Sequence, residues 1–201
     1  MTSLSIPNTA PSARTQVSKL DQARLAAKMV EGLQDEDHSM KLAYLRAIDT
    51  SSKSITIADP YVSDPDIYGH LESAARRGVD VRLILPHHNN QKPSQESERT
   101  DYKDLLESGV KVFEYTGRPM AHDKVAVFDH RVATIGSSNL DRVSLNDNDE
   151  SNVWVDDSRV ANPLEAALVH DQQDSIPITS DHPGLSENLQ NHVGAWLMSW
   201  V

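Results

Sequence analysis

Apolar residues recur at helical spacing in some stretches of the chain and gather into short, β-branched runs in others. The helical spacing predicts helices over residues 17–33, 39–52, 64–77, 100–108 and 160–170. The short runs predict strands at 54–62, 79–85, 110–115, 124–135 and 152–155. The run at 79–85 is almost continuously apolar, which is typical of a strand covered on both faces. This alternation predicts an α/β fold, with a mixed β-sheet flanked by helices.

The two ends of the chain depart from this pattern. Residues 1–16 are rich in Ser, Thr and Pro, so we expect a disordered lead-in, with an uncleaved export signal of a secreted effector as the alternative. Residues 17–201 are expected to form one domain, because this length suits one core better than two. The apolar tail 189–201 is expected to pack on the domain or on a second subunit. It has no Lys or Arg, so peripheral membrane contact is the less favoured alternative.

Composition narrows the classes of function. The formal net charge of -11 and the pI near 5.1 argue against general affinity for nucleic acid, which depends on Lys and Arg neutralising phosphates. The chain has no cysteine, so a thiolate metal site or nucleophile is excluded. No apolar run is long enough to span a membrane, and the N-terminus lacks the apolar centre of a secretory signal. We therefore expect a cytoplasmic or peripheral membrane protein.

The strongest chemical signal lies where the predicted strand at 124–135 begins. His122 and Lys124 are two residues apart, so in an extended backbone both side chains project to one face while Asp123 points away. An imidazole beside an ammonium is poorly suited to a core and well suited to a phosphate. The ammonium can hold the anion while the neutral imidazole attacks it.

Further residues follow this pair at fixed spacing. Asp129 comes five residues after Lys124, and Gly136-Ser137-x-Asn139 follows. This set resembles the signature of the phospholipase D superfamily. The segments 77–86, 109–115 and 139–142 are also similar to the second catalytic repeat of bacterial cardiolipin synthases and related phosphatidyltransferases. The similarity extends over roughly residues 40–175.

The resemblance implies that residues 17–201 form a phospholipase D-like catalytic domain. In that superfamily one motif histidine attacks phosphorus to give a phosphohistidine, and a second histidine protonates the leaving alcohol. Water or another alcohol then attacks the intermediate. We expect a phospholipid substrate, on the basis of the flanking segments and the acidic charge, with a metal-independent homodimeric endonuclease as the alternative. No cofactor is expected, and the sequence offers no convincing set of metal ligands.

The motif residues receive separate roles in this interpretation. Lys124 and Asn139 are expected to supply a charge and an amide donor to the phosphate, and Ser137 either contacts the phosphate or fixes the turn at Gly136. A nucleophilic imidazole needs a partner on its other nitrogen, and Glu150 matches the acidic residue that the family carries beyond the Asn. Asp129 lies on the opposite strand face from His122, so we interpret it as structural.

Three residues outside the motif are candidates for the pocket. In the family a Pro-Tyr pair ends the corresponding strand near the site, so Tyr61 either lines the pocket or caps the core. His87 and His88 follow the strand at 79–85, at the end where open α/β sheets place ligands. Neighbouring residues rarely chelate one ion together, so we prefer a solvated loop with some substrate contact over a metal site.

The sequence holds a single copy of the motif, because no other histidine is followed two residues later by lysine. One copy cannot supply both nucleophile and acid. We therefore expect a symmetric homodimer that brings two His122 side chains together, as single-motif nucleases of the superfamily do. A catalytic half that needs a different partner chain, and a degenerate half that only binds, are the alternatives.

Overall fold

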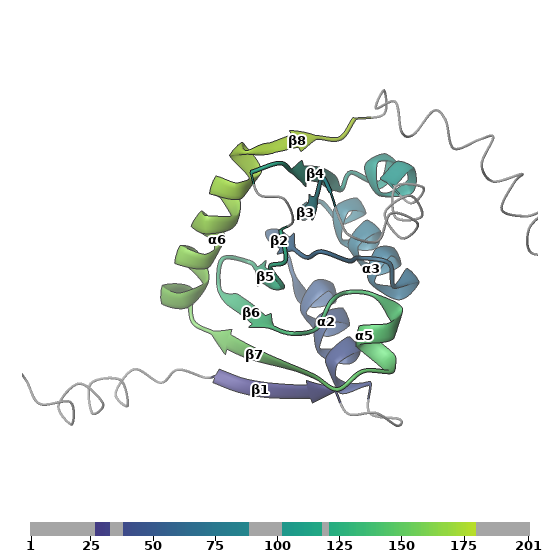
Figure 1. Ribbon diagram of the computed structural model, residues 1–201. Coiled ribbons are helices and arrows are strands. Elements are labelled where there is room, and N and C mark those ends of the chain that lie inside the picture. Colours follow the sequence, from purple (N-terminus) through teal and green to yellow (C-terminus); the bar gives the residue numbers. More distant parts are fainter. Residues whose placement is uncertain (1–26, 33–37, 89–101, 118–120, 180–201) are drawn as a thin grey trace, which may run out of the picture.

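A mixed β-sheet runs through the structure, with helices on both of its faces (Figure 1). The computed structural model describes residues 27–32, 38–88, 102–117 and 121–179. The strands are β1 (Ala27–Gly32), β2 (Ser54–Ala58), β3 (Asp80–Pro86), β4 (Lys111–Tyr115), β5 (Val125–Phe128), β6 (Val132–Gly136), β7 (Glu150–Asp156) and β8 (Ser175–Pro177). The helices are α2 (Ser39–Thr50), α3 (Pro65–Arg76), α5 (Arg142–Asn146) and α6 (Ser158–Gln173), with a further helical segment over 102–108.

The order of strands in the sheet is β1-β7-β6-β5-β2-β3-β4-β8. Strands β2, β3 and β4 are parallel, and the remaining pairs are antiparallel. Helix α3 connects β2 to β3, which is the crossover that a parallel pair requires. The predicted α/β fold with a mixed, helix-flanked sheet is therefore confirmed.

Helices α2 and α3 lie on one side of the sheet and α6 on the other (Figure 1). An apolar cluster lies between the sheet and the helices on each side. On one side, buried strand residues such as Ile57 and Leu83 belong to the same cluster as Tyr44 of α2 and Leu71 of α3. On the other side, Val127 belongs to the cluster that contains residues of α6. The central strands are thus covered on both faces, which explains their continuous apolar runs. None of the described helices combines the length and apolar character needed to cross a bilayer.

The edges of the sheet differ from the sequence expectation. The helix predicted over 17–33 is wrong where the structure describes it, because β1 pairs with β7 along its full length. The last strand predicted from the sequence is 152–155, yet β8 (Ser175–Pro177) also joins the sheet and pairs with β4. Both strands are added through non-local backbone hydrogen bonds, which local spacing of apolar residues does not reveal. The expected lead-in 1–16 and tail 189–201 lie outside the described residues.

The turn between β5 and β6 has an unusual backbone. Asp129 and His130 have φ values of 52° and 59°, although neither is glycine. Positive φ at both central residues of the 128–131 turn is typical of type I′ turns, where Asn and Gly are favoured. The strands pair Phe128 with Val132, so three residues lie between them. The Asp129 carboxylate accepts hydrogen bonds from the backbone N–H groups of Ser52, Lys53 and Ser54 at 2.7–3.1 Å. These bonds hold the turn against the start of β2.

The bonds also set the charge of Asp129. Partial burial opposes ionisation, but the three backbone donors and the Ser52 hydroxyl outweigh it and hold the pKa of Asp129 below its usual value. A lowered pKa stabilises the fold above the pKa of the unfolded carboxyl, about 3.9. That contribution is lost as the pH falls through the lower pKa of the folded state.

We predict that Asp129→Ala lowers the free energy of unfolding by about 2 kcal/mol at pH 7, because three backbone donors lose a charged acceptor. The difference from the wild type should shrink as the pH falls below about 4. Chemical denaturation at several pH values measures both effects. Asp104→Ala, at an exposed position of the 102–108 helix, is the matched control and should change stability by less than about 0.5 kcal/mol. Equal effects of the two substitutions would contradict this account.

Candidate active site

The motif residues lie together at one end of the central strands, which we call the catalytic edge. In the strand register, Ala58 at the end of β2 lies opposite Val125 at the start of β5. Val125 in turn pairs with Ile135 near the end of β6, and Gly136 pairs with Asn152 of β7. The segments 59–61, 122–124 and 137–139 and the start of β7 therefore meet at this edge.

His122 and Lys124 lie side by side there. The Lys124 Nζ is 3.0 Å from the His122 Nδ1, as two residues on one strand face permit. The imidazole is exposed, whereas Lys124 is buried, with 8% of its surface accessible. An ammonium fixed below an accessible imidazole is a suitable seat for an anion.

A buried carboxyl accompanies the ammonium. Asp59, 3% exposed, follows β2 directly, and its Oδ1 accepts from the backbone N–H of Tyr61 at 2.9 Å. Burial raises the pKa of Asp59 well above its usual value, while hydrogen bonding to the Tyr61 N–H and the nearby positive charge of Lys124 oppose that rise. A carboxyl and an ammonium buried in one place constrain each other's positions, because neither can easily move into water.

Two loops flanking the site are joined through their backbones. The N–H groups of Ser63 and Asp64 both donate to the carbonyl of Leu140 at 3.1 Å, and Val62 forms a β-bridge with Leu140. The second loop starts at Gly136, where an added Cβ would overlap the Asn152 side chain and the backbone of the neighbouring strand. Glycine is therefore needed at 136 for close approach of the two chains.

We expected the Asn139 amide nitrogen to donate to the phosphate, but in the unliganded chain it donates within the protein. Its Nδ2 donates to Ser144 Oγ at 3.2 Å, and that hydroxyl donates to Asp141 Oδ2 at 3.2 Å. Since the hydroxyl hydrogen is committed to Asp141, Ser144 can only accept from Asn139. This chain fixes the amide and leaves Asn139 Oδ1 buried without a hydrogen-bond partner. In the unliganded chain, the Asn139 atom that is available to a ligand is therefore the acceptor Oδ1.

Glu150 does not reach the imidazole of its own chain through any hydrogen bond seen among the described residues. Its Oε2 instead accepts from the hydroxyl of Ser137, and that hydroxyl also accepts from the backbone N–H of Ser151 at 3.1 Å. Ser137 therefore links the Gly136 turn to the start of β7. The expected role of Glu150 as partner of His122 remains a prediction.

Tyr61 lies beside His122. Its ring meets the His122 ring edge-on, with centroids 6.5 Å apart. Tyr61 and Asn139 also line a cleft of about 370 Å³ next to the motif. The rest of the lining is mainly polar and consists of Ser63, Asp141, Arg142, Val143, Ser144 and Asn148.

His87 and His88 follow β3, the strand next to β2, and lie at the same end of the sheet. Their rings are 4.4 Å apart, and His87 Nδ1 is 2.6 Å from Oε2 of the fully buried Glu114. Neither histidine lines the cleft beside the motif. Substrate contact by this pair remains a prediction.

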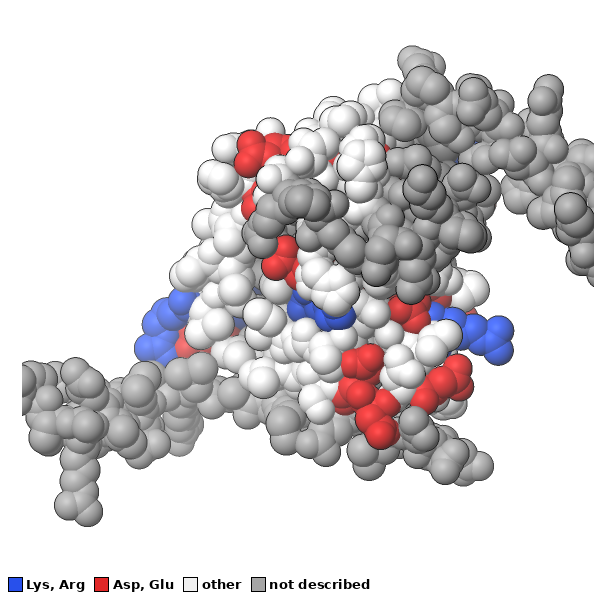
Figure 2. All heavy atoms as spheres, viewed as in Figure 1, with Lys and Arg blue, Asp and Glu red and all other residues white. Residues whose placement is uncertain are grey.

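The described residues contain no group of three or more His, Cys, Asp and Glu side chains placed to hold a metal ion. On the face shown in Figure 2, Asp and Glu side chains lie among scattered Lys and Arg, without a broad basic surface. The positive charge at the motif is therefore local.

Sequence reasoning did not single out the residues that hold the motif in place. Asp59 had a recognisable signal, because it is a carboxylate directly after an apolar strand and just before the Pro-Tyr pair. Asp141 and Ser144 had the spacing of a helix N-cap, which they form at α5, but nothing that linked them to Asn139. Their role is visible only in three dimensions.

Comparison with known proteins places the site in context. A family model described as "Cardiolipin synthase, PLD-like domain" matches residues 44–171. The cardiolipin synthase of Alkalihalophilus pseudofirmus is 36% identical over 139 residues, which cover 69% of this chain and 27% of that protein. The probable cardiolipin synthase YwiE of Bacillus subtilis is 35% identical over 142 residues, covering 70% and 28%. The chain thus spans little more than a quarter of the length of these relatives.

Solved structures share the fold at lower identity. Nuc from Salmonella typhimurium, a phospholipase D family member, matches with a TM-score of 0.68 at 22% identity, covering 77% of this chain and 99% of Nuc. Phosphatidylserine synthase from Haemophilus influenzae matches with a TM-score of 0.64 at 16% identity, covering 77% of this chain and 40% of that protein.

Proposed function

Because the chain belongs to the family of cardiolipin synthase, phospholipase D-like domains, we propose that it transfers a phosphatidyl group by way of a phosphohistidine on His122. The observation that carries the proposal is the accessible imidazole held 3.0 Å from a buried ammonium. The identity of the relatives as cardiolipin synthases supports a phospholipid as substrate.

The first step requires Lys124 to change partner. In the unliganded chain its ammonium donates to Nδ1 of His122, which places the proton of a neutral imidazole on Nε2. A bound phosphate attracts the ammonium to its oxygens and releases Nδ1. The imidazole then loses its proton from Nε2 to water and gains one on Nδ1 from water, and the Nε2 lone pair attacks phosphorus. The bond to the leaving alcohol breaks as the second histidine of the reaction protonates that alcohol. Lys124 meanwhile stabilises the charge on the phosphate oxygens.

The cleft beside the motif is the proposed seat of the alcohol part of the lipid head group. Its volume of about 370 Å³ and its hydroxyl and amide lining suit a small polyol. Asn139 Oδ1, buried and unpaired among the described atoms, needs a hydroxyl or amine donor. An alcohol supplies such a donor, whereas a phosphate oxygen does not.

We predict metal-independent reaction of the chain with phosphatidylglycerol vesicles in EDTA, measured as release of glycerol or formation of a new phosphatidyl ester. His122→Ala should reduce the rate by at least about 1,000-fold, because the nucleophile is lost. His38→Ala, which removes an exposed histidine without a helix-capping hydrogen bond, should leave the rate unchanged. Cleavage of DNA without any reaction of the lipid would overturn the lipid assignment in favour of a nuclease.

The given sequence holds a single motif, so we propose that the second histidine of the reaction comes from a second copy of this unit. A homodimer with two facing sites is the proposed solution. The fold match, which covers 99% of Nuc but 40% of phosphatidylserine synthase, supports this proposal. Within one chain, Glu150 binds Ser137 and His122 binds Lys124. We propose that assembly of the dimer brings a carboxylate to the His122 imidazole and orients it.

We predict a light-scattering mass of twice the 22.3 kDa of one chain. Mixing wild-type protein with inactive His122→Ala protein should produce mixed dimers that lack one histidine. If both histidines serve one reaction, activity falls as the square of the wild-type fraction. A linear fall would contradict the use of two histidines in one reaction, and an active species of 22.3 kDa would contradict the dimer.

We also propose that residues 17–201 form one catalytic domain. A phospholipid substrate requires action at a membrane surface, so we assign the protein a peripheral membrane location. The expected contact through residues 189–201 lies outside the described structure.

A further inference from the structure

The exposed apolar side chains of the described residues gather at one end of the molecule. The large ones, with 41–55% of their surface accessible, are Leu42, Ile135, Val143, Val153 and Ile176. Single exposed apolar residues are normal on a protein surface, so their mere presence carries no weight. Their distribution does carry weight, because each lies nearer to the catalytic edge than to the opposite end of the sheet, which we call the far end.

Ile135 and Val153 form the centre of this group. They pair directly across β6 and β7, one position in from the pair of Gly136 and Asn152 that ends the β6–β7 ladder at the catalytic edge. Ala133 lies two residues farther from the edge on the same face of β6. It is buried in the apolar cluster that contains residues of α6, so the cover that α6 provides ends before Ile135.

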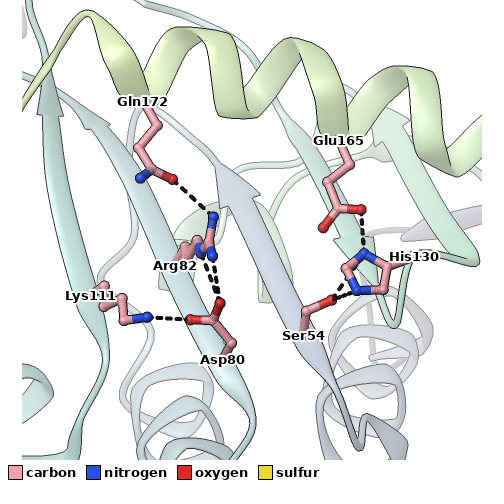
Figure 3. Close-up of polar contacts among 7 residues, drawn as sticks. All are labelled: Ser54, Asp80, Arg82, Lys111, His130, Glu165 and Gln172. Carbon is pink, nitrogen blue, oxygen red and sulfur yellow. Dashed lines mark hydrogen bonds and ion pairs between the residues drawn. The ribbon is translucent and has the colours of Figure 1, made fainter.

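Helix α6 is held at the far end of the sheet by polar contacts (Figure 3). Glu165 Oε2 is 2.6 Å from Nδ1 of His130 in the β5–β6 turn, and Gln172 Oε1 accepts from Arg82 at 3.4 Å. Arg82 also bonds Asp80 at 2.6 and 3.0 Å. The side chains drawn at the far end are therefore polar and paired with one another, whereas the catalytic half of β6 and β7 presents bare apolar side chains.

Val143 connects the exposed apolar group to the substrate site. It lies on α5 and is 55% exposed, yet it also lines the cleft of about 370 Å³ beside the motif. Tyr61 and Asn139 line the same cleft. An apolar side chain that borders this cleft and faces solvent lies where the apolar part of a bound lipid would leave it.

The two remaining side chains lie farther out at the same end. Leu42 is in the first turn of α2, next to Lys41, which binds Asp64 in the loop after β2 at 2.9 Å. Ile176 of β8 pairs with Glu114, near the end of β4 that lies at the catalytic edge. The exposed apolar side chains thus surround the catalytic edge on several elements.

The charge of the protein limits how this surface can bind a partner. The chain has a formal net charge of -11, and Asp147, Asp149 and Glu150 lie beside the catalytic edge, in the loop before β7 and at its start. An anionic lipid surface repels such a protein, so Lys and Arg cannot supply the binding. Burial of apolar side chains in the membrane interface can supply it.

We propose that Ile135, Val143 and Val153 enter the interfacial layer of a phospholipid membrane and hold the catalytic edge against it. Leu42 and Ile176 border this contact. The proposal rests on the proposed function, because a lipid whose acyl chains stay in the bilayer reaches His122 only when the catalytic edge faces the membrane. Binding is driven by apolar burial and acts against the net charge of the protein.

Vesicle sedimentation with the full-length His122→Ala protein tests the proposal without consuming the lipid. The vesicles contain phosphatidylcholine with a minor fraction of phosphatidylglycerol. Ile135→Thr combined with Val153→Thr keeps β-branched residues in the strands but removes apolar surface, and should weaken binding about fivefold. Ile135→Trp should strengthen binding about tenfold, because Trp favours the membrane interface. Ala166→Trp, at an exposed position that lines a cleft at the far end, is the matched control and should bind like its parent.

Salt and oligomeric state decide between this contact and others. High salt should leave vesicle binding unchanged or strengthen it, because screening weakens only the repulsion. Release by salt, or unchanged binding of the double Thr variant, would overturn the proposal. A double variant whose light-scattering mass falls while its vesicle binding per chain is unchanged would assign Ile135 and Val153 to a contact between two copies, and would also overturn it.

A short-chain phosphatidylglycerol, dispersed as monomers, separates this proposal from the proposed function. With His122 intact, the double Thr variant should lose at least about threefold more of its rate on vesicles than of its rate on the dispersed lipid. Equal losses on the two substrates would contradict a role in membrane binding. If the wild type reacts with neither substrate, the proposed function fails, while sedimentation still decides whether the catalytic edge binds the membrane.

Discussion

The placement of the Lys124 charge is the constraint on which the catalytic edge depends. Removing an ammonium from water costs several kcal/mol unless charged or polar partners surround it. Here the partners are His122, 3.0 Å away, and the buried carboxyl of Asp59. Bound phosphate oxygens would provide a stronger partner for the same ammonium. The unliganded chain therefore holds a fixed positive charge that an anion can satisfy better than the imidazole does.

The rest of the architecture keeps this charge in place. Strand β5 carries Lys124 between β2 and β6, and both neighbours are held by continuous backbone pairing. At the far end of β5, Asp129 joins the turn to the start of β2 through three backbone N–H groups. At the near end, the N–H groups of Ser63 and Asp64 donate to the Leu140 carbonyl and so connect the two flanking loops. Within the first of these loops, the Tyr61 N–H donates to Asp59. The motif aspartate thus acts on the site through the geometry of the strand.

Sequence patterns predicted the sheet, most of its helices and the pairing of His122 with Lys124, because these features depend on local spacing. They missed β1 and β8, since an edge strand is defined by the partner that offers it hydrogen bonds. The amide orientation of Asn139 depends on Ser144 and Asp141, and the contact of Glu150 depends on Ser137. Such partners follow from tertiary packing, which a one-dimensional pattern does not encode.

The central claim is that His122 becomes covalently bonded to the lipid phosphate. Rapid quenching of the wild-type protein with phosphatidylglycerol carrying a labelled phosphorus, followed by peptide mapping, tests it most directly. The account predicts one labelled peptide, modified at residue 122, with the acid lability and alkaline stability of a phosphoramidate bond. Label on any other residue, or an active preparation that accumulates no label under conditions that slow the second step, would contradict it.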